Sequence, residues 1–281
     1  MEPSPRVVLL CPVRGCGTPL TRGERAWACP CGHSFDRAKS GYVNLLQPQD
    51  KRSKTPGDSK DAVAARRRLL EAGHDAPFLD DLKATIRALP LPAHPAVLDV
   101  GCGEGTHLAA LAAAFQAEAH GLDLSVPAID LAARTHPGPT WVVANADRFL
   151  PYAEGAFDLA MSLTARMNAP ELRRILAPEG RLLVAVPAED DLAELREAVL
   201  GEKHLRNRVD RTVATFAADF DLESHHLVRW VARMDAAGVR DVLASTYRGG
   251  RESQRGRVEG LGGGAVTMGR DVLVFRGKPR V

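Results

Sequence analysis

The stretch Val97-Leu98-Asp99-Val100-Gly101-Cys102-Gly103-Glu104-Gly105 decides the fold of this chain, and an acidic residue, Asp123, closes the next apolar run. This order predicts a buried parallel strand, a glycine-rich turn, a helix and a second strand that ends in a carboxylate. Glycines let the backbone approach a ligand because no Cβ stands in the way, and a carboxylate can bind a pair of ribose hydroxyls. The stretch therefore predicts a nucleotide-type site at the carboxyl edge of a doubly wound α/β sheet.

The spacing of the glycines narrows the class of ligand. The run reads G-x-G-x-G behind an acid, whereas a dinucleotide-binding loop reads G-x-G-x-x-G. This pattern resembles motif I of the class I S-adenosylmethionine (SAM) methyltransferases, which implies a Rossmann-like methyltransferase fold with SAM as its cofactor. The residues expected to bind SAM are Asp99, Gly101, Gly103, Gly105, Asp123, Leu124, Asn145 and Ala146.

Each part of SAM needs a different kind of partner. The acid and the first two glycines of the loop suit the methionine part, Asp123 suits the ribose, and Leu124 can line one face of the adenine. Asn145 stands where the methyltransferase class often has an acid that contacts the adenine amino group, and an amide oxygen can accept the same bond. A competing interpretation of Asp123 is a turn or helix cap.

Apolar runs alternate with helical patterns on either side of the loop, as in a parallel sheet with right-handed crossovers. The expected strands cover 95–100, 119–124, 141–144, 157–162 and 181–186, with helices from 105 to about 117 and over 127–134. In the carboxyl-terminal third we expect a helix over 190–200, late strands within 212–228, a helix over 229–237 ended by Gly238, a loop over 248–264 and a closing strand over 271–275.

Four of the five cysteines cluster near the amino terminus, in the order Cys11, Cys16, Cys29 and Cys31, with His33 directly after them. Two groups of soft ligands about a dozen residues apart are typical of a structural zinc ion in a short chain segment. Cys29 and His33 are spaced to face one metal, whereas Cys29 and Cys31 would point to opposite sides of an extended chain. The predicted ligands are Cys11, Cys16, Cys29 and His33, with Cys31 as the alternative to His33.

Charge is unevenly distributed along the 281 residues, although the net charge is only +2. Residues 1–70 hold 13 Lys and Arg against 6 Asp and Glu, so the amino-terminal part is basic and the remainder is acidic. This asymmetry favours a polyanion such as nucleic acid as a partner of the amino-terminal module. No apolar run reaches the roughly 20 residues that span a bilayer, and the first 13 residues lack a signal-peptide pattern. We therefore expect a cytoplasmic protein without a membrane partner.

A polar, basic segment with Pro56-Gly57 follows the cysteine module, and Asp58 or Ser59 can cap a helix over 60–72. The triplet Arg66-Arg67-Arg68 near the end of this helix has two interpretations: cations that suit the helix dipole, or a stripe that contacts phosphates. The expected division is a zinc-binding RNA-recognition module over 1–48, a basic linker and helix over 49–75, and a methyltransferase domain over 76–281.

These residues together resemble the RlmA/TlrB family of 23S rRNA (guanine-N1)-methyltransferases. The resemblance rests on the cysteine cluster with His33 and on the runs 35–36, 41–46, 51–53, 56–59, 65–67 and 72–74. It implies SAM-dependent methylation of guanine N1 in a domain II hairpin of 23S rRNA, with an amino-terminal zinc finger. A homodimer is compatible with the resemblance, and nothing in the residues establishes it.

The sequence indicates less clearly which residues bind the methyl acceptor. In the segment after the fourth strand, Arg166 replaces a proline expected in the family, and Tyr247 falls where the family has aromatic residues near the substrate cleft. Both are candidate substrate-side residues, and the general base is unknown. The alternatives to an rRNA methyltransferase are a small-molecule methyltransferase and a non-catalytic rRNA-binding protein that retains the SAM fold.

Overall fold

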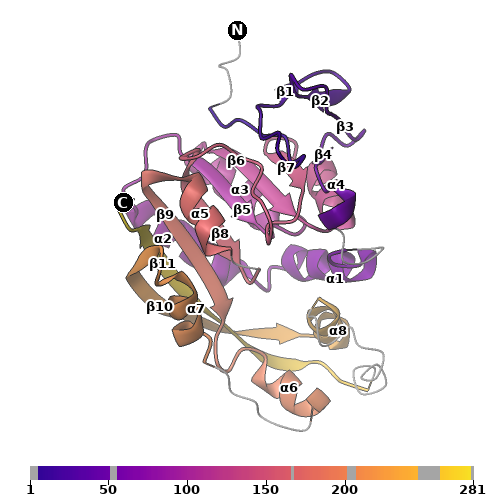
Figure 1. Cartoon of the computed structure of the whole chain (residues 1–281). Coiled ribbons are helices and arrows are strands. Elements are labelled where there is room, and N and C mark those ends of the chain that lie inside the picture. The colour runs from indigo at the N-terminus through magenta and orange to yellow at the C-terminus, as the bar shows by residue number, and fades with distance from the viewer. Residues whose placement is uncertain (1–5, 51–55, 166–167, 201–206, 246–259, 280–281) are drawn as a thin grey trace.

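The computed structural model of the chain describes residues 6–50, 56–165, 168–200, 207–245 and 260–279 (Figure 1). The strands are β1 (Thr21–Arg22), β2 (Ala26–Ala28), β3 (Ser34–Asp36), β4 (Val43–Asn44), β5 (Ala96–Val100), β6 (Glu118–Asp123), β7 (Thr140–Val143), β8 (Phe157–Leu163), β9 (Leu176–Pro187), β10 (Phe220–Met234) and β11 (Gly264–Gly277). The helices are α1 (Lys60–Glu71), α2 (Ala76–Ala88), α3 (Thr106–Phe115), α4 (Val126–Thr135), α5 (Ala169–Ile175), α6 (Ala193–Leu200), α7 (Val209–Phe216) and α8 (Ala236–Ala244), with a short 3-10 turn, η1, over Pro48–Asp50.

Eight strands form one mixed sheet in the order β10-β11-β9-β8-β5-β6-β7-β4. The six strands from β9 to β4 are parallel, whereas β11 pairs antiparallel with both β9 and β10. The chain runs outward from β5 through β6 to β7, and then returns to β8 on the other side of β5. In open α/β sheets a ligand binds at the carboxyl ends of the strands where the strand order reverses. The topology therefore places a binding site after β5.

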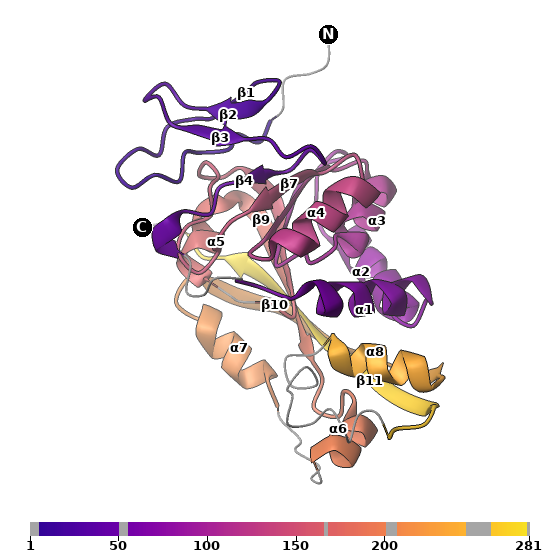
Figure 2. The same cartoon turned by 90° about the vertical axis from the view of Figure 1, so that its right-hand side faces the viewer.

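The central strands are apolar because helices cover both faces of the sheet. All five residues of β5 and all seven of β8 are buried. Figure 2 shows α2, α3 and α4 on one face and α5 and α7 on the other. Two large apolar clusters correspond to these two faces, one containing Phe157 and Phe216 and the other Trp141 and Phe78. The result is the doubly wound sheet that the glycine stretch predicts.

The amino-terminal module is attached to this sheet by backbone pairing as well as by side chains. Strands β1 to β3 form their own three-stranded sheet, but β4 continues from it and pairs parallel with β7, with Val43 opposite Val142. Leu9 forms an antiparallel bridge with Tyr152, and both are fully buried in one apolar cluster. The core of the module is thus continuous with the core under the sheet. The division of the chain at residues 48 and 75 stays a prediction.

The last two strands extend beyond the rest of the sheet. β11 pairs with β9 only from Arg270 to Arg276, whereas it pairs with β10 from Gly264 to Gly277. Figure 1 shows this extension with α6 and α8 beside it, at the opposite end of the molecule from β1 to β3. A third apolar cluster lies there, and it includes Leu69 of α1 together with residues of α6, α8, β10 and β11.

The expected strands and helices of the methyltransferase core are confirmed with shifts of a few residues, and so are α6 and the closing strand within β11. Two predictions in the carboxyl-terminal third are wrong. Residues 229–234 are not helical but belong to β10, and the helix near them, α8, begins at Ala236, so that Gly238 lies in its first turn. The first part of 212–228 is helix α7 and not a strand. From His226 to Met234 the burial alternates with a period of two, which is a strand signal.

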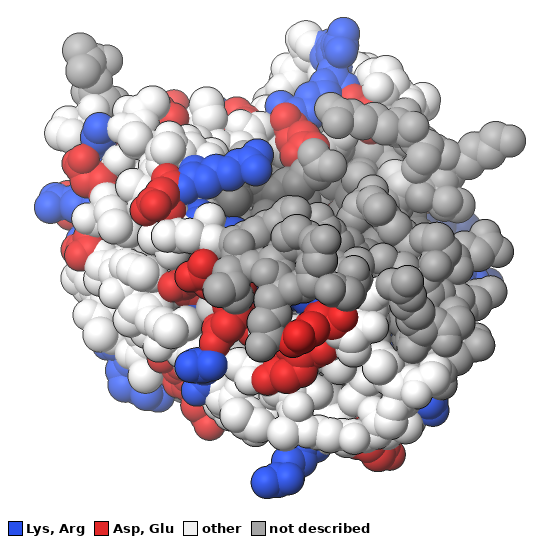
Figure 3. All heavy atoms as spheres, turned by 90° about the horizontal axis from the view of Figure 1, so that it is seen from below, with Lys and Arg blue, Asp and Glu red and all other residues white. Residues whose placement is uncertain are grey.

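The described helices and the described surface at the end away from β1 to β3 bear on the expected membrane and nucleic-acid partners. Within the described residues, none of the helices combines the length and apolarity that crossing a bilayer requires. In Figure 3, which views the molecule from below, basic and acidic side chains are interspersed, and several acidic ones gather near the middle of the described part.

Candidate functional site

The glycine loop after β5 brings the chain into contact with two other elements. Gly101 has φ +79°, and a Cβ there would lie 2.3 Å from the Cβ of Ala165, which follows β8. Gly105 has φ +83°, and its Cβ would lie 2.3 Å from the indole ring of Trp141. Only glycine combines this backbone conformation with such close packing. Gly103, by contrast, has no heavy atom closer to its Cβ position than 3.7 Å, so this part of the loop is open to a ligand.

Replacing Gly105 with alanine is expected to destabilise the fold by roughly 2–4 kcal/mol, because the new methyl group overlaps Trp141 and the left-handed backbone is strained for a side chain. Thermal unfolding measures the effect. Gly138→Ala is the matched control, since a Cβ at Gly138 meets no atom within 4 Å. Equal unfolding temperatures for the two variants would contradict this account of Gly105.

Asp123 ends β6 and connects the second strand to the glycine loop. Its carboxylate accepts hydrogen bonds from the backbone N–H of Gly103 at 3.0 Å and of Ser125 at 2.8 Å. Burial raises the pKa of Asp123, and the two backbone donors oppose this shift. Asp123 therefore does cap the neighbouring turns, as the competing interpretation predicts. Each carboxylate oxygen still has a lone pair that can accept a hydrogen bond from a ligand hydroxyl.

A cavity of about 270 Å³ lies over the carboxyl ends of β5, β6 and β8. Six of the predicted SAM-binding residues line it: Gly101, Gly103, Asp123, Leu124, Asn145 and Ala146. Two others, Asp99 and Gly105, are not among the residues that line it. The remaining described lining residues are Gly57, Asp58, Arg66, Val100, Leu122, Ala144, Asp147, Leu163, Thr164 and Ala165.

Asp99 lies beneath the glycine loop and is 1% exposed. Its Oδ1 atom has no hydrogen-bond partner among the described residues, and burial raises the pKa of this carboxyl to about 7. A buried carboxylate without partners is costly unless a ligand or water satisfies it. Asp99 does not line the cavity, and the fit to a cationic cofactor such as SAM comes from Asp58, Asp123 and Asp147, which line it together with the open part of the glycine loop.

The side-chain amide of Asn145 already makes two hydrogen bonds within the protein. Its side-chain oxygen accepts a hydrogen bond from the backbone N–H of Asp147 at 3.1 Å, and its Nδ2 donates to the backbone oxygen of Asp50 at 3.2 Å. The predicted bond from adenine would therefore use the second lone pair of the amide oxygen. Asp147 also lines the cavity and was not expected from the sequence.

One wall of the cavity comes from the segment before the methyltransferase fold, which sequence reasoning did not assign to the site. Gly57 has φ +83°, and a Cβ there would come within 2.6 Å of the backbone of Ser125. The Ser125 hydroxyl donates to the backbone oxygen of Asp58 at 2.8 Å. Ser59 then caps α1, as predicted, by accepting from the backbone N–H of Ala62. The Pro56-Gly57 turn was the available signal, but its contact with α4 depends on the tertiary fold.

The arginine triplet of α1 does not form a row of free cations. The Nε atom of Arg66 lies 3.5 Å from a carboxylate oxygen of Glu104. Arg67 donates to Glu71 and to the hydroxyl of Thr135, both at 2.6 Å. Arg68 binds Asp241 of α8 through two hydrogen bonds of 2.8 and 2.6 Å. The triplet therefore holds α1 against three other parts of the fold. These side chains do not form a stripe that contacts phosphates.

His107, in the first turn of α3, also has a structural partner. Its Nε2 atom lies 2.8 Å from a carboxylate oxygen of Asp75, and both side chains are buried. Burial alone would raise the pKa of Asp75, but the hydrogen bond and charge of His107 hold the pKa below its ordinary value. This pair joins α3 to the start of α2.

The two candidate substrate-side residues, Arg166 and Tyr247, lie outside the described residues. The segment that leads to Arg166 does line the cavity, since Leu163, Thr164 and Ala165 are part of its wall. Thr164 has φ +63°, an uncommon conformation for a residue with a branched side chain. Strain of this kind often occurs at functional sites.

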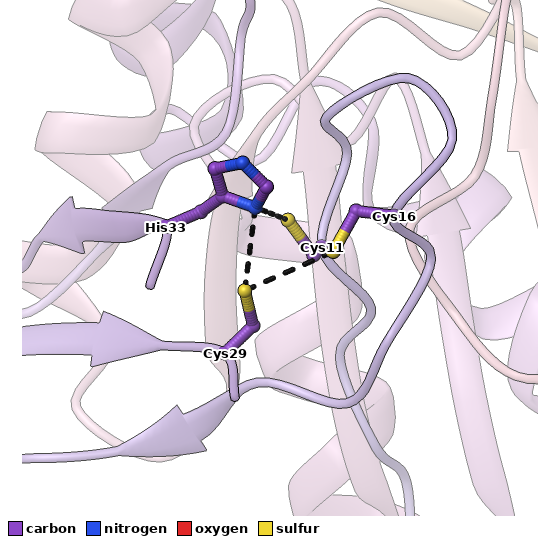
Figure 4. A group of neighbouring side chains, drawn as sticks. All are labelled: Cys11, Cys16, Cys29 and His33. Atoms are coloured by element: carbon purple, nitrogen blue, oxygen red, sulfur yellow. Dashed lines mark hydrogen bonds between the residues drawn. The ribbon is translucent and has the colours of Figure 1, made fainter. Parts of the chain in front are cut away.

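The amino-terminal cysteines and His33 converge on one point (Figure 4). The ligand atoms of Cys11, Cys16, Cys29 and His33 all lie within 4.8 Å of one another. The Sγ atoms of Cys16 and Cys29 are 3.8 Å apart, and the Nδ1 atom of His33 is 3.4 Å from the Sγ atoms of Cys11 and Cys29. Tetrahedral zinc has edges of about 3.8 Å between two sulfurs and about 3.5 Å between sulfur and nitrogen.

The donor set and its spacing therefore fit a zinc ion closed by four protein ligands. Cys31 is exposed, and it is not among the four residues whose ligand atoms converge. A closed tetrahedral site leaves no position for a substrate, so the zinc is structural.

Comparisons with known proteins agree with both parts of the fold. A family model described as "RlmA, N-terminal" matches residues 9–54, and a methyltransferase domain model matches residues 97–184. The 23S rRNA (guanine(748)-N(1))-methyltransferase of Streptomyces fradiae is 40% identical over 239 residues, which cover 84% of this chain and 83% of that protein. YxjB of Bacillus subtilis is 31% identical over 244 residues, which cover 84% of each chain.

Solved structures support the fold. A chain from the complex of the Haloferax volcanii Trm112 methyltransferase activator with a methyltransferase matches with a TM-score of 0.52 and 19% identity. The match covers 79% of this chain and 99% of that one. The Rossmann-like methyltransferase fold with an amino-terminal zinc ribbon is thereby confirmed.

Proposed function

Because the chain belongs to the RlmA family of 23S rRNA (guanine-N1)-methyltransferases, we propose that it methylates N1 of the guanine that corresponds to guanine 748, the target of the Streptomyces fradiae relative. The proposal rests above all on one observation: the 40% identity to that enzyme covers 84% of this chain. A small-molecule methyltransferase would not require the RlmA-type zinc ribbon. The proposed RNA partner is a hairpin of 23S rRNA, and the proposed location is the cytoplasm, where ribosomes are assembled.

The cavity residues have defined tasks in this proposal. SAM supplies a methyl group on a positively charged sulfur. The backbone of Gly101 and Gly103 would lie against its methionine part, Asp123 would accept bonds from the ribose hydroxyls, and Asp99 would provide negative charge beneath the loop. Bound SAM would supply the methyl group to guanine N1, with the electron pair of the broken C–S bond staying on the sulfur of S-adenosylhomocysteine and the N1 proton passing to water. The protein's contribution to such an in-line displacement is to align the two reactants and exclude water.

The acceptor guanine would approach along the segment after β8. Leu163, Thr164 and Ala165 supply this wall of the cavity. A base in a hairpin must leave its stack to enter such a pocket, and aromatic or cationic side chains commonly receive it. Arg166 and Tyr247 stay the candidates for that role.

The zinc ribbon offers a surface for the RNA. Arg22 of β1 and Arg25 of the turn before β2 are exposed. A second cavity, of about 250 Å³, lies between this sheet and the turn before β7, and Arg22, Trp27, Arg37 and His136 are among the residues that line it. Cations beside an aromatic side chain are the usual means of binding phosphates and bases together.

Removing two of these charges, Arg22→Ala with Arg25→Ala, is expected to raise the KM for rRNA by roughly 10-fold at physiological salt, with little change in kcat. Phosphate contacts act on binding, and their loss also flattens the salt dependence. Methyl transfer measured at two salt concentrations tests this. Arg233→Ala, which removes an exposed cation from β10 at the other end of the molecule, is the control. A fall in kcat with unchanged KM would contradict the assignment.

The experiment that tests the function is methyl transfer from labelled SAM to 23S rRNA from cells that lack this protein, followed by primer extension. N1 methylation removes a Watson–Crick donor and stops the polymerase, so a stop at the guanine that corresponds to guanine 748 is expected. Absence of label while SAM is still bound would refute the proposed acceptor. A homodimer stays a prediction, which light scattering can check.

A further inference from the structure

Arg66 lies on α1, which precedes β5 and the glycine loop in the chain, yet it lines the cofactor cavity. It stands over the open part of the glycine loop, since its Nε atom would be 3.7 Å from a Cβ at Gly103. In Figure 2, α1 runs alongside the methyltransferase core on the same side as α4. A helix from the linker therefore contributes a cation to the site.

Several contacts hold this cation in place. Glu104 is 2% exposed, and its Oε2 atom is 3.5 Å from Arg66 Nε, with no hydrogen-bond partner within the described part of the chain. Arg67 and Arg68, the next two residues of α1, anchor the helix to Thr135 and Asp241. The Arg66 side chain is still 34% exposed, so part of its guanidinium is available to a ligand.

The charges around the cavity indicate which part of SAM the Arg66 guanidinium can bind. The described lining residues include three carboxylates, Asp58, Asp123 and Asp147, and a single Lys or Arg, which is Arg66. The methionine end of SAM carries an ammonium group, a sulfonium and a carboxylate. The acids suit the two cationic groups and the ribose, but the carboxylate requires donors. A guanidinium binds a carboxylate through two parallel hydrogen bonds.

We infer that Arg66 binds the carboxylate at the methionine end of SAM and of its product, S-adenosylhomocysteine. Helix α1 is then part of the cofactor site, and Glu104 acts as a positioning residue that orients the guanidinium over Gly103. This inference rests on the cofactor part of the proposed function and is independent of which nucleotide is methylated.

The test compares two ligands by calorimetry on the full-length protein. S-adenosylhomocysteine carries the carboxylate, whereas 5′-methylthioadenosine shares the adenosine and the thioether but lacks the amino-acid end. Arg66→Gln is expected to weaken the binding of S-adenosylhomocysteine by about 10- to 100-fold, the loss expected for hydrogen bonds between charged groups. The affinity for 5′-methylthioadenosine should stay within about twofold, since no contact to it is removed.

Arg233→Gln is the matched control, because it removes the same charge from an exposed position of β10, away from the cavity, and should leave the ratio of the two affinities unchanged. Arg66→Lys keeps a positive charge but lacks the planar guanidinium, so it should recover part of the affinity for S-adenosylhomocysteine. Circular dichroism establishes that each variant is folded. Should Arg66→Gln fail to fold, the comparison is made with Arg66→Lys.

The outcomes separate this inference from the proposed function. Equal weakening of both ligands by Arg66→Gln would show a structural role, and no weakening of either would show that the carboxylate is held elsewhere; each result overturns the assignment of Arg66. Failure of the wild-type protein to bind S-adenosylhomocysteine would overturn the cofactor assignment itself.

Discussion

Replacing Asp123 with alanine is expected to lower the affinity for SAM by at least roughly 100-fold and to abolish detectable methyl transfer at ordinary SAM concentrations. Two hydrogen bonds between a carboxylate and the ribose hydroxyls contribute about 1.5–3 kcal/mol each. The substitution also removes the acceptor for the backbone N–H of Gly103 and Ser125, so the glycine loop loses one of its hydrogen bonds to β6. Calorimetry with SAM and the transfer assay measure the two effects.

The control for this variant is Asp80→Ala. The Asp80 side chain is 76% exposed on α2 and has one long contact, 3.5 Å to Lys83. It should bind SAM as the wild type does. Normal SAM affinity in the Asp123 variant would refute the assignment of this cavity as the cofactor site.

Replacing Cys29 with serine is expected to remove the zinc ion and to lower the Tm by roughly 10 °C or more. Structural zinc contributes about 10–16 kcal/mol in small zinc modules, and each kcal/mol lost corresponds to roughly 2–4 °C in a larger domain. The effect should extend beyond the module, because Cys11 and Cys29 belong to the same buried cluster as Val142 and Tyr152 of the methyltransferase core. Zinc content by mass spectrometry and thermal unfolding measure it.

Cys31→Ser provides a matched control two residues away. Cys31 is exposed and lies outside the group of four ligand atoms, so this variant should retain one zinc per chain and the wild-type Tm. Loss of zinc from the Cys31 variant, with zinc retained in the Cys29 variant, would show that the ligand set is wrong.

Local patterns predicted the elements that surround the cofactor cavity. The buried strand, the glycines and the acid at the end of the next strand are each required by backbone geometry within a few residues, so the sequence shows them directly. The same holds for the zinc ligands, since the reach of Cys29 and His33 toward one point depends on their spacing alone. The incorrect helix over 229–237 arose because the exposed face of β10 carries the apolar residues Leu227 and Val231, so the sequence hides the alternation that the burial shows.

The sequence by itself determined the fold class, the chemistry of the glycine loop and the region of the metal site, because these features depend on local patterns, whereas the structure decided between His33 and Cys31. Only the tertiary structure decided that Gly105 accommodates Trp141, that Gly57 lies against Ser125 and that Arg66 enters the cofactor cavity. The physical reason is that each of these contacts joins residues far apart in the chain. Their distance is set by how α1, α4 and the strands pack, and no local periodicity or motif records that packing.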